Sequence, residues 1–246
     1  MTSKNILLTG ASRGIGAVVA LELASQGHIV GCLSRRGTGP EAIDIPDELK
    51  ERLICLKGDV VDRESMRKAF EAFASQVGHI DGVINNAGIH LEGPSHSQTL
   101  TDFSQVLETN VTATFSVCQL AYPFLEERGG LIVNIGSFFD KLGVRRNAAY
   151  AASKAAVGAV TRCLAVEWAS KKIRLLTVAP GYIETDLNKE FLQAEKVKTF
   201  LAARIPVGGP AQATDVAKLI GMLYARDVDY FTGETLYVDG GQGMAL

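Results

Sequence analysis

The sequence predicts an α/β protein built around a doubly wound parallel sheet of about seven strands, with helices on both faces. Short apolar runs alternate with helical patterns along the whole 246-residue chain. The apolar runs are rich in Val, Ile and Leu and lack the apolar–polar alternation of a sheet with one solvated face, so both faces are expected to be covered. Right-handed crossovers between such strands give the doubly wound order.

Each element can be placed along the chain. Strands are expected at residues 6–8, 29–33, 53–56, 82–84, 131–135, 175–178 and 235–238. Helices are expected at about residues 14–26, 62–77, 100–127, 149–170 and 211–225. No linker, repeat or low-complexity segment interrupts the alternation, so residues 1–246 are interpreted as a single domain.

One apparent insertion, at about residues 184–206, lies between a Pro180-Gly181 turn and the last helix. An insertion at this place is expected to form a mobile lid over a substrate. Its apolar residues either line a pocket or pack the lid against the body, and they are Leu187, Phe191, Leu192, Val197, Phe200 and Leu201.

A glycine-rich turn joins the first strand to the first helix and reads Thr9-Gly10-Ala11-Ser12-Arg13-Gly14-Ile15-Gly16. A strand, turn and helix in this order direct backbone N–H groups and a helix N-terminus toward a pyrophosphate. Gly10 is expected to permit the tight turn, Gly14 the close approach of a phosphate, and Gly16 the packing of helix on strand. The spacing G-x-x-x-G-x-G differs from the G-x-G-x-x-G fingerprint, and the alternative is an ordinary tight connection.

Tyr150 and Lys154 lie four residues apart in a run of small residues that predicts a helix, so they share one helix face. A nearby cation favours the phenolate and is expected to lower the tyrosine pKa from its usual value of ~10. A tyrosine of this kind can act as a general acid or base. A lone Tyr-x-x-x-Lys pair also occurs by chance in many helices.

The composition excludes several classes of protein. Lys and Arg number 25 and Asp and Glu 27, for a net charge of −2, so there is no basic field for nucleic acid. No apolar run reaches the ~18 residues of a membrane span, and residues 1–5 lead directly into the first strand, which leaves no room for a signal peptide. Cys32, Cys55, Cys118 and Cys163 are far apart, and three lie in apolar stretches, as expected for buried, reduced thiols of a cytoplasmic protein. The four histidines are scattered too, so no metal site is expected.

Five motifs stand in a fixed order, namely Thr9-Gly10-x-x-x-Gly14-Ile15-Gly16, Asn85-Asn86-Ala87-Gly88, Ser137, Tyr150-x-x-x-Lys154 and Pro180-Gly181. In this order and spacing the chain resembles the short-chain dehydrogenases/reductases over essentially its whole length, and residues 230–241 look like that family as well. Within the family the chain is most similar to the 3-oxoacyl-[acyl-carrier-protein] reductases. The resemblance implies a Rossmann-type dinucleotide-binding domain and an oxidoreductase that interconverts a ketone and a secondary alcohol.

The resemblance also implies a catalytic set of Asn110, Ser137, Tyr150 and Lys154. Tyr150 would protonate the developing alkoxide, and Ser137 would donate a hydrogen bond to it. Lys154 would lower the tyrosine pKa and hold the nicotinamide ribose. Asn110 would disturb its helix locally and bind a water that leads to the lysine. Without the resemblance, Asn110 is a solvated helix residue and Ser137 a cap.

The choice of cofactor is indicated by Ser34-Arg35-Arg36, which follows the second strand where an NAD enzyme usually carries an acid for the ribose 2′-hydroxyl. An arginine can bind the 2′-phosphate that an acid would repel. Arg13 lies where relatives that prefer NADP often carry a second base, so Ser34, Arg35 and Arg13 predict a 2′-phosphate clamp and NADP(H) as cofactor. The alternative is that Arg35 and Arg36 are solvated loop residues.

Further cofactor contacts are implied by the resemblance. Asp59 would contact the adenine amino group, or alternatively cap the helix that begins near residue 62. The Asn85–Gly88 segment would line the cofactor crevice, or alternatively be a plain turn. Ile183 and Thr185 would hold the carboxamide. The full expected cofactor set is Gly10, Ser12, Arg13, Gly14, Ile15, Gly16, Ser34, Arg35, Asp59, Val60, Asn86, Ala87, Gly88, Tyr150, Lys154, Pro180, Gly181, Ile183 and Thr185.

Three functions stay open. The first is an NADPH-dependent reductase of 3-oxoacyl thioesters, and the second is an NAD(P)-dependent dehydrogenase of a sugar, polyol, steroid or other secondary alcohol. The third is a non-catalytic nucleotide sensor, which would be expected to have lost Tyr150 or Lys154. Phe138-Phe139, where many relatives have smaller residues, predicts an aromatic-walled pocket and departs from the 3-oxoacyl reductase pattern.

Possible partners follow from the same resemblance. Arg128 and Lys171 fall where acyl-carrier-protein-dependent reductases carry bases that meet the acidic carrier, and the alternative is isolated surface charges. Arg145-Arg146 contacts an acidic substrate group or nothing. The family also implies a homotetramer with isologous interfaces, formed by the two long helices and the last strand.

Overall fold

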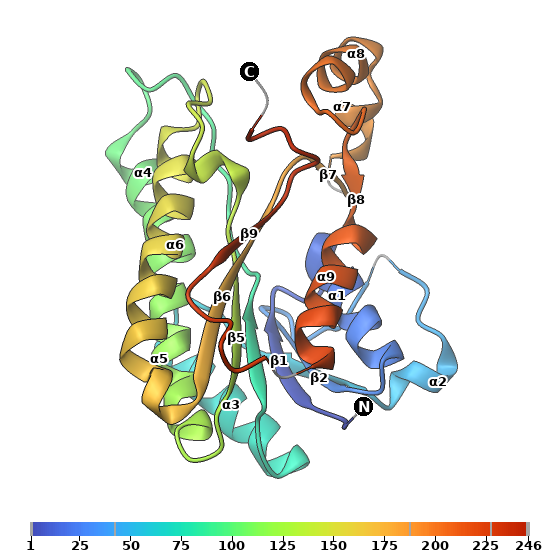
Figure 1. The fold of residues 1–246 in the computed structure, drawn as a ribbon, viewed down its shortest axis with the longest axis vertical. Coiled ribbons are helices and arrows are strands. Elements are labelled where there is room, and N and C mark those ends of the chain that lie inside the picture. Colours follow the sequence, from blue (N-terminus) through green and yellow to red (C-terminus); the bar gives the residue numbers. More distant parts are fainter. Residues whose placement is uncertain (1, 42, 187, 227, 245–246) are drawn as a thin grey trace.

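The computed structural model describes residues 2–41, 43–186, 188–226 and 228–244, and its centre is one seven-stranded sheet. Figure 1 shows how the sheet and its helices are arranged. The strand order is β3-β2-β1-β4-β5-β6-β9 and every neighbouring pair is parallel. The strands are β1 (Asn5–Thr9), β2 (Ile29–Ser34), β3 (Leu53–Lys57), β4 (Gly82–Asn85), β5 (Gly130–Ile135), β6 (Ile173–Pro180) and β9 (Thr235–Val238). The predicted doubly wound parallel sheet and all seven of its strands are confirmed.

Helices cover both faces of the sheet, as expected. One face carries α1 (Gly14–Ser25) and α9 (Ala213–Ala225), and the other carries α3 (Arg63–Val77), α5 (Ala113–Leu125) and α6 (Ala148–Trp168) (Figure 1). A short helix α4 (Leu100–Leu107) precedes α5 and packs on α6, and a single-turn helix α2 (Asp47–Lys50) lies in the β2–β3 connection.

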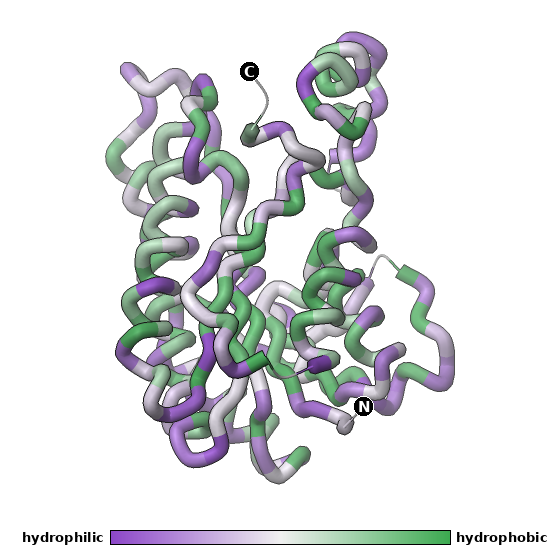
Figure 2. Tube along the Cα trace, viewed as in Figure 1, coloured by the Kyte–Doolittle hydropathy of each residue, from purple (hydrophilic) through white to green (hydrophobic). Residues whose placement is uncertain are grey.

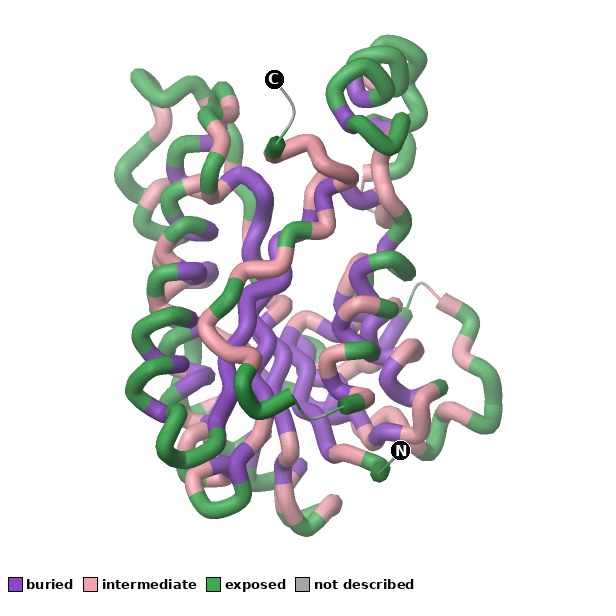
Figure 3. The backbone as a smooth tube through the Cα atoms, in the orientation of Figure 1, coloured by how far each residue is buried: buried purple, intermediate pink, exposed green. Residues whose placement is uncertain are grey.

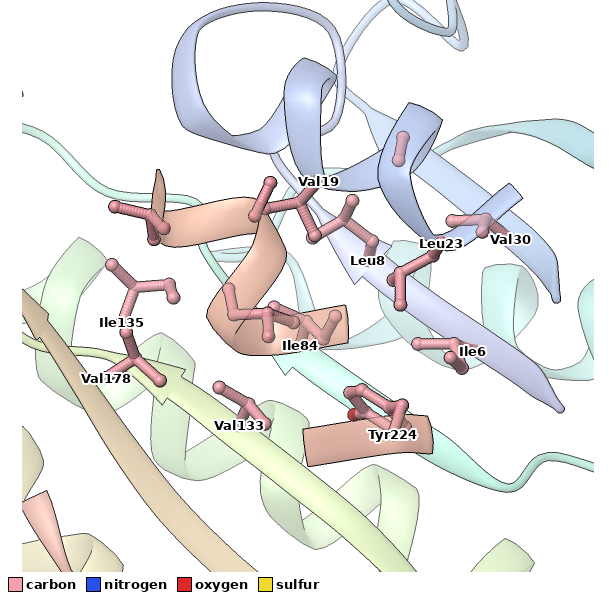
Figure 4. Packing of buried hydrophobic residues seen from close by; sticks show 14 of the residues in the cluster. Ile6, Leu8, Val19, Leu23, Val30, Ile84, Val133, Ile135, Val178 and Tyr224 are labelled. Carbon is pink, nitrogen blue, oxygen red and sulfur yellow. The ribbon is translucent and has the colours of Figure 1, made fainter. Parts of the chain in front are cut away.

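The core is divided by the sheet into two apolar clusters. Ile6 and Leu8 of β1 face α1 and α9, in the cluster drawn in Figure 4, whereas Leu7 between them packs against α3 and α5 on the other face. This division follows from the two-residue period of a strand. Figures 2 and 3 show the consequence, since the central strands and the inner stripes of the helices are apolar and buried. Tyr224 of α9 closes the first cluster and donates its hydroxyl proton to the Leu131 carbonyl at 2.9 Å.

The structure differs from the prediction in two regions. The helix expected at residues 100–127 is present from Leu100 to Leu125, but it contains a π-helical turn at Glu108–Thr112 between α4 and α5. The expected insertion forms two short helices, α7 (Lys189–Gln193) and α8 (Glu195–Arg204). These helices lie between β7 (Ile183–Glu184) and β8 (Ala211–Gln212), which pair in parallel with each other.

The four cysteines are all free thiols, but the expectation that three are buried is wrong. Cys32 and Cys118 are buried, and burial raises the pKa of each thiol to about 12. Cys55 is exposed because it lies on β3, the edge strand of the sheet, and Cys163 is exposed on α6. Across the described ranges, no helix has both the length and the apolar character that crossing a membrane requires.

Candidate active site

The motif residues meet along one edge of the sheet. The glycine-rich turn follows β1, the Asn85–Gly88 segment closes β4, Ser137 follows β5, and Pro180-Gly181 closes β6. Because these strands are parallel, their carboxyl ends lie together at the edge where doubly wound sheets bind their ligands.

The glycine-rich turn is shaped by two glycines that have no room for a side chain. A Cβ on Gly10 would lie 2.9 Å from the Ala87 Cα atom, and Gly10 has a φ of +67°. A Cβ on Gly16 would lie 2.2 Å from the Gly10 carbonyl oxygen, which fixes the close packing of α1 on the strand. Gly14 also has a positive φ, +58°. These positions agree with the steric roles expected of Gly10 and Gly16.

Asn86 and Thr9 bind the turn to the end of β4. The Asn86 side chain donates to the Thr9 and Gly10 carbonyls at 3.1 and 3.0 Å. The Thr9 hydroxyl accepts from the backbone N–H groups of Asn86 and Ala87, both at 3.0 Å. The Asn85–Gly88 segment therefore supports the turn directly, and it is more than a connection between strand and loop.

The N–H of Gly14 points at an anionic oxygen. It donates to the carboxylate of Asp186, which follows β7, at 3.2 Å. A cavity of about 380 Å³ lies beside this contact, lined by Gly14, Thr185, Asp186 and neighbours from α9. The turn therefore presents the Gly14 N–H to a negatively charged group.

The proposed 2′-phosphate clamp lies next to the turn, because the Gly10 and Ala11 N–H groups both donate to the Leu33 carbonyl of β2. Arg13 and Arg35 are exposed, and within the described ranges neither guanidinium makes a hydrogen bond or an ion pair. Arg36 instead pairs with Glu41. The Ser34 hydroxyl donates to the Thr38 carbonyl at 2.7 Å, so its proton holds the loop in shape.

Asp59 and Val60 follow β3 at the same edge of the sheet, and both are partly buried. The alternative role of Asp59 as a helix cap is wrong. The cap of α3 is Asp62, whose carboxylate accepts from the N–H groups of Glu64 and Ser65, both at 3.0 Å. From the described residues, Asp59 accepts just the Val61 N–H, at 3.3 Å, so its carboxylate keeps capacity for a further donor.

Lys154 is buried in α6, one turn after Tyr150. Its ammonium donates to the Ile135 carbonyl at the end of β5 at 2.7 Å and lies 5.6 Å from the centroid of the Tyr150 ring. A Cβ on nearby Gly88 would meet the ammonium nitrogen at an ordinary 3.7 Å but would crowd the Asn110 side-chain oxygen at 3.1 Å. Burial disfavours the charged form and lowers the pKa of Lys154 to about 8.

The Ser137 side chain lies next to the Tyr150 phenol, as the family resemblance implies. Burial raises the pKa of Tyr150, and the Ser137 side chain partly opposes that rise. The expectation that Lys154 lowers this pKa is therefore not met in the structure, because the desolvation of the phenolate outweighs other effects. Ser137 is buried, and its hydroxyl also accepts from the Phe139 N–H at 3.3 Å.

Asn110 lies in the π-helical turn, where the helix is locally disturbed as the resemblance implies. Its side chain accepts from the Ile89 N–H at 2.8 Å and donates to the Ile89 carbonyl at 2.9 Å. It also donates to the Ser153 hydroxyl at 3.0 Å, and Ser153 in turn donates to the Tyr150 carbonyl at 2.7 Å. Asn110 is buried, so it ties the loop after β4 to the helix that carries Tyr150.

An aromatic cluster surrounds the phenol, which agrees with the prediction from Phe138-Phe139. The Phe139 ring meets Tyr150 edge-on at 5.9 Å between centroids, and Phe138 packs on Phe139 at 4.7 Å. The sequence interpretation did not identify Tyr182, which contacts Phe138 at 5.3 Å, or His90, whose ring lies 4.5 Å from Tyr150. Tyr182 directly follows Gly181, and His90 lies two residues after Gly88. Their places next to recognised motifs could have identified both residues from the sequence.

The segment expected to form a lid has a small core of its own. Leu192, Leu201 and Ile205 are buried together, with Tyr182 and Val197 packed against them. Phe191 and Phe200 are exposed, and Figure 3 shows α7 and α8 exposed over most of their surface. The buried apolar residues thus pack the segment itself, while Leu187 lies outside the described residues.

The segment after β6 places the remaining expected cofactor residues. Gly181 lies so close to the C-terminal segment that a Cβ would be 2.7 Å from the Asp239 Cα atom, and its N–H donates to the Val238 carbonyl. Ile183 is buried in β7, and Thr185 donates its N–H to the Asn188 side chain at 2.8 Å. Asn188 thereby fixes the turn that carries Thr185.

Arg128 and Lys171, which were considered as contacts for a carrier protein, lie at the opposite edge of the sheet from Ser137. Arg128 and Lys171 are exposed near the amino ends of β5 and β6, whereas Ser137 follows the carboxyl end of β5, a strand of six residues that spans roughly 20 Å. Arg146 forms an ion pair with Glu92 at 3.7 Å, and Arg145 is exposed. In the described part of the chain, no three His, Cys, Asp or Glu side chains are grouped as around a metal ion.

Comparison with known proteins places the chain in a family. A family model described as enoyl-(acyl carrier protein) reductase matches residues 10–242. The 3-oxoacyl-[acyl-carrier-protein] reductase FabG of Staphylococcus aureus (strain N315) is 32% identical over 246 residues, which cover 98% of this chain and 99% of that protein. The chain belongs to the short-chain dehydrogenase/reductase family.

Other members of the family are similar to the same degree. The 3beta-hydroxysteroid dehydrogenase 1 of Eggerthella lenta is 31% identical, over 99% of this chain and 95% of that protein. The crystal structure of a gluconate 5-dehydrogenase from Burkholderia cenocepacia J2315 in complex with NADP and tartrate has a TM-score of 0.88 and 29% identity, and covers 100% of this chain and 97% of that one. Because these relatives act on different compounds, overall similarity leaves the substrate to be argued from the site.

Proposed function

We propose that the protein is an NADP(H)-dependent oxidoreductase that interconverts a ketone and a secondary alcohol, and that it reduces 3-oxoacyl thioesters. The observation that carries the proposal is the Tyr150 phenol, which lies next to Ser137 and one helical turn from the buried Lys154 ammonium. This set stands at the same edge of the sheet as a turn shaped for a pyrophosphate. The similarity to 3-oxoacyl reductases supports the choice of substrate.

The residues present fit a dinucleotide. Gly10, Gly14 and Gly16 would cradle the pyrophosphate, and the carboxylate already bound by the Gly14 N–H supports that role. Arg13 and Arg35 would hold the 2′-phosphate, because both guanidinium groups are exposed beside the turn. A family member bound to NADP supports the same choice of cofactor.

The chain's own residues would manage the proton. When bound, the nicotinamide supplies hydride exchange with the reacting carbon. The raised pKa of Tyr150 keeps the phenol protonated at neutral pH, so it can donate its proton to the oxygen of a ketone. Ser137 would donate a second hydrogen bond to that oxygen, and the Lys154 ammonium would stabilise the negative charge left on the phenol.

A second candidate is a dehydrogenase of another secondary alcohol, such as a steroid, sugar or polyol. The aromatic cluster of Phe138, Phe139 and Tyr182 beside the phenol supports it, because these rings restrict the space that an extended acyl chain would use. The similarity to a hydroxysteroid dehydrogenase and a gluconate dehydrogenase supports it as well.

The test is to follow oxidation of NADPH and of NADH by the purified protein with a short 3-oxoacyl thioester. Turnover with NADPH and little with NADH is expected. Tight binding of NADPH without turnover of the thioester would move the activity to other ketones and alcohols. A preference for NADH would contradict the roles given to Arg13 and Arg35.

Two proposals about assembly accompany this function. A carrier-linked substrate would meet Arg128 and Lys171, so its turnover should fall with added salt while that of a free thioester does not.

A homotetramer would cover the apolar residues Phe115 of α5 and Val166 of α6, which are 39% and 82% exposed in the single chain. Light scattering of the purified protein tests the tetramer.

A further inference from the structure

His90 lies at the centre of the candidate site, although the proton transfer proposed above does not use it. It comes two residues after Gly88, in the loop that leaves β4. Its imidazole packs against the Tyr150 ring at 4.5 Å between centroids and a tilt of 43°. Its edge meets the Phe139 ring at 6.5 Å. The imidazole therefore forms one wall of the space around the reacting phenol.

The orientation of this imidazole is fixed by Asn147, the buried residue that precedes α6. The Asn147 amide nitrogen donates to the Arg145 carbonyl at 2.8 Å, so its oxygen is the end that faces Nε2 of His90. An amide oxygen only accepts, so Nε2 of His90 must carry the proton. In the neutral ring Nδ1 is then left with a lone pair and acts as an acceptor.

Nδ1 of His90 has no hydrogen-bond partner anywhere in the described part of the chain. His90 also lines a cavity of about 320 Å³ formed by the loop of residues 90–102. The other ionisable residues of that cavity are Glu92 and Asp102, and neither Lys nor Arg lines it. Among the residues that line this cavity, His90 and Asp102 can accept a hydrogen bond, so a ligand that carries a donor fits this lining.

We propose that His90 is a specificity-determining residue whose Nδ1 accepts a hydrogen bond from a donor on the substrate, a few bonds from the reacting carbonyl. The inference rests on the proposed function and narrows its substrate. Two kinds of substrate carry such a donor: a ketone with a neighbouring hydroxyl group, and a thioester whose cysteamine arm has an amide N–H. Ketones that lack a donor would leave Nδ1 unpaired and would react more slowly.

The kinetic test uses two matched pairs of substrates with saturating NADPH. One pair is a β-hydroxy ketone and the ketone in which a methyl group replaces that hydroxyl. The other is a 3-oxoacyl N-acetylcysteamine thioester and its N-methylated amide analogue. The wild type should prefer the donor-bearing member of one pair by about tenfold in kcat/KM, and that pair identifies the source of the donor.

The variant His90→Phe keeps a ring against Tyr150 and removes the acceptor. It should abolish the preference, so that the two members of the pair react with the same kcat/KM in the variant. His96→Phe is the matched control, since His96 is exposed in the same loop and does not line the cavity. An unchanged preference in His90→Phe, or no preference for either pair in the wild type, overturns the proposal for His90 alone. No turnover of any of the four compounds overturns the proposed function as well.

A second measurement does not depend on turnover. Nitrogen-15 NMR of the imidazole, assigned by the signal that disappears in His90→Phe, reports which ring nitrogen is protonated. The Nε2–H form is expected for His90 because of Asn147. A proton found mainly on Nδ1 would overturn the proposal, since that nitrogen could not accept.

Discussion

The two ends of the candidate site differ in how their polar groups are engaged. At the catalytic end, Asn110, Ser137 and Lys154 are buried and each has a partner within the chain. At the nucleotide end, Arg13 and Arg35 are exposed, and among described residues neither has a partner. The catalytic end is thus built before any ligand arrives, whereas the nucleotide end keeps its charged groups free for one.

This difference has a consequence for mutations. Changes at the catalytic end should affect the rate of the chemical step or the stability of the fold, because the groups there are fixed by burial and hydrogen bonds. Changes at the nucleotide end should affect cofactor affinity and leave the fold intact, because exposed groups contribute little to folding. Each prediction below tests one side of this contrast.

The largest effect is expected for Tyr150→Phe. The phenol is the proposed proton donor, and losing general acid catalysis typically costs 10²–10⁴-fold in rate. We expect kcat to fall by about a thousandfold, while NADPH affinity and the thermal midpoint stay near those of the wild type. Steady-state kinetics, fluorescence titration with NADPH and thermal unfolding provide the three measurements. A variant that keeps normal turnover would show that Tyr150 is not the acid.

The catalytic end was also the part best anticipated from the sequence, though not in all respects. The placement of Tyr150 and Lys154 on one helix face followed from their spacing, and that of Ser137 beside them followed from the family resemblance. The sign of the Tyr150 pKa shift did not, because it depends on burial, which spacing along a helix does not reveal. The role of Asn147 in orienting His90 was not predictable either, because 57 residues separate them in the chain.

The fold shows the same limit. Strands of the central sheet were predictable because each is a continuous apolar run buried on both faces. The π-helical turn around Asn110 was expected only from the family resemblance, because no Gly or Pro marks it within Glu108–Thr112 and it depends on contacts with Ile89 and Ser153. Helices α7 and α8 were not predicted from the sequence, because they are short and bury few residues, chiefly Leu192 and Leu201.

The next largest effect concerns the stability contributed by Lys154. Below pH 8 the folded and unfolded chains both carry a charged lysine, and the folded chain bears the full cost of burying it. Between pH 8 and its ordinary pKa of 10.5, the folded protein has released a proton that the unfolded chain still binds. The free energy of unfolding should therefore rise with pH across this window, by about 3 kcal/mol for this group.

Lys154→Met should lack that rise. Urea unfolding of both proteins between pH 7 and 10.5 measures it, as the wild-type free energy of unfolding minus that of the variant. We expect this difference to increase with pH, because only the wild type has the buried amine. A difference that stays constant would mean that Lys154 is not desolvated as the structure indicates.

At the nucleotide end, Arg35→Ala should weaken NADPH binding by about ten- to a hundredfold, the range for a charge-assisted hydrogen bond to a phosphate. NADH affinity and the thermal midpoint should hardly change, because Arg35 is exposed. Arg36→Ala is the matched control, since that side chain pairs with Glu41 instead. Equal loss for NADPH and NADH would show that Arg35 does not read the 2′-phosphate.

The smallest effect, and the one that refines the contrast, is expected for Asp186→Asn. The Asp186 carboxylate takes the Gly14 N–H that a pyrophosphate would use, so the two negative groups compete. Removing the charge should tighten NADPH binding by about two- to fivefold at physiological ionic strength, where screening keeps the effect modest. Glu184→Gln is the control, because Glu184 lines the same cavity but accepts from Gln193 at 2.9 Å. Weaker NADPH binding in Asp186→Asn would mean that the carboxylate helps to build the phosphate site, and the nucleotide end would then be as preorganised as the catalytic end.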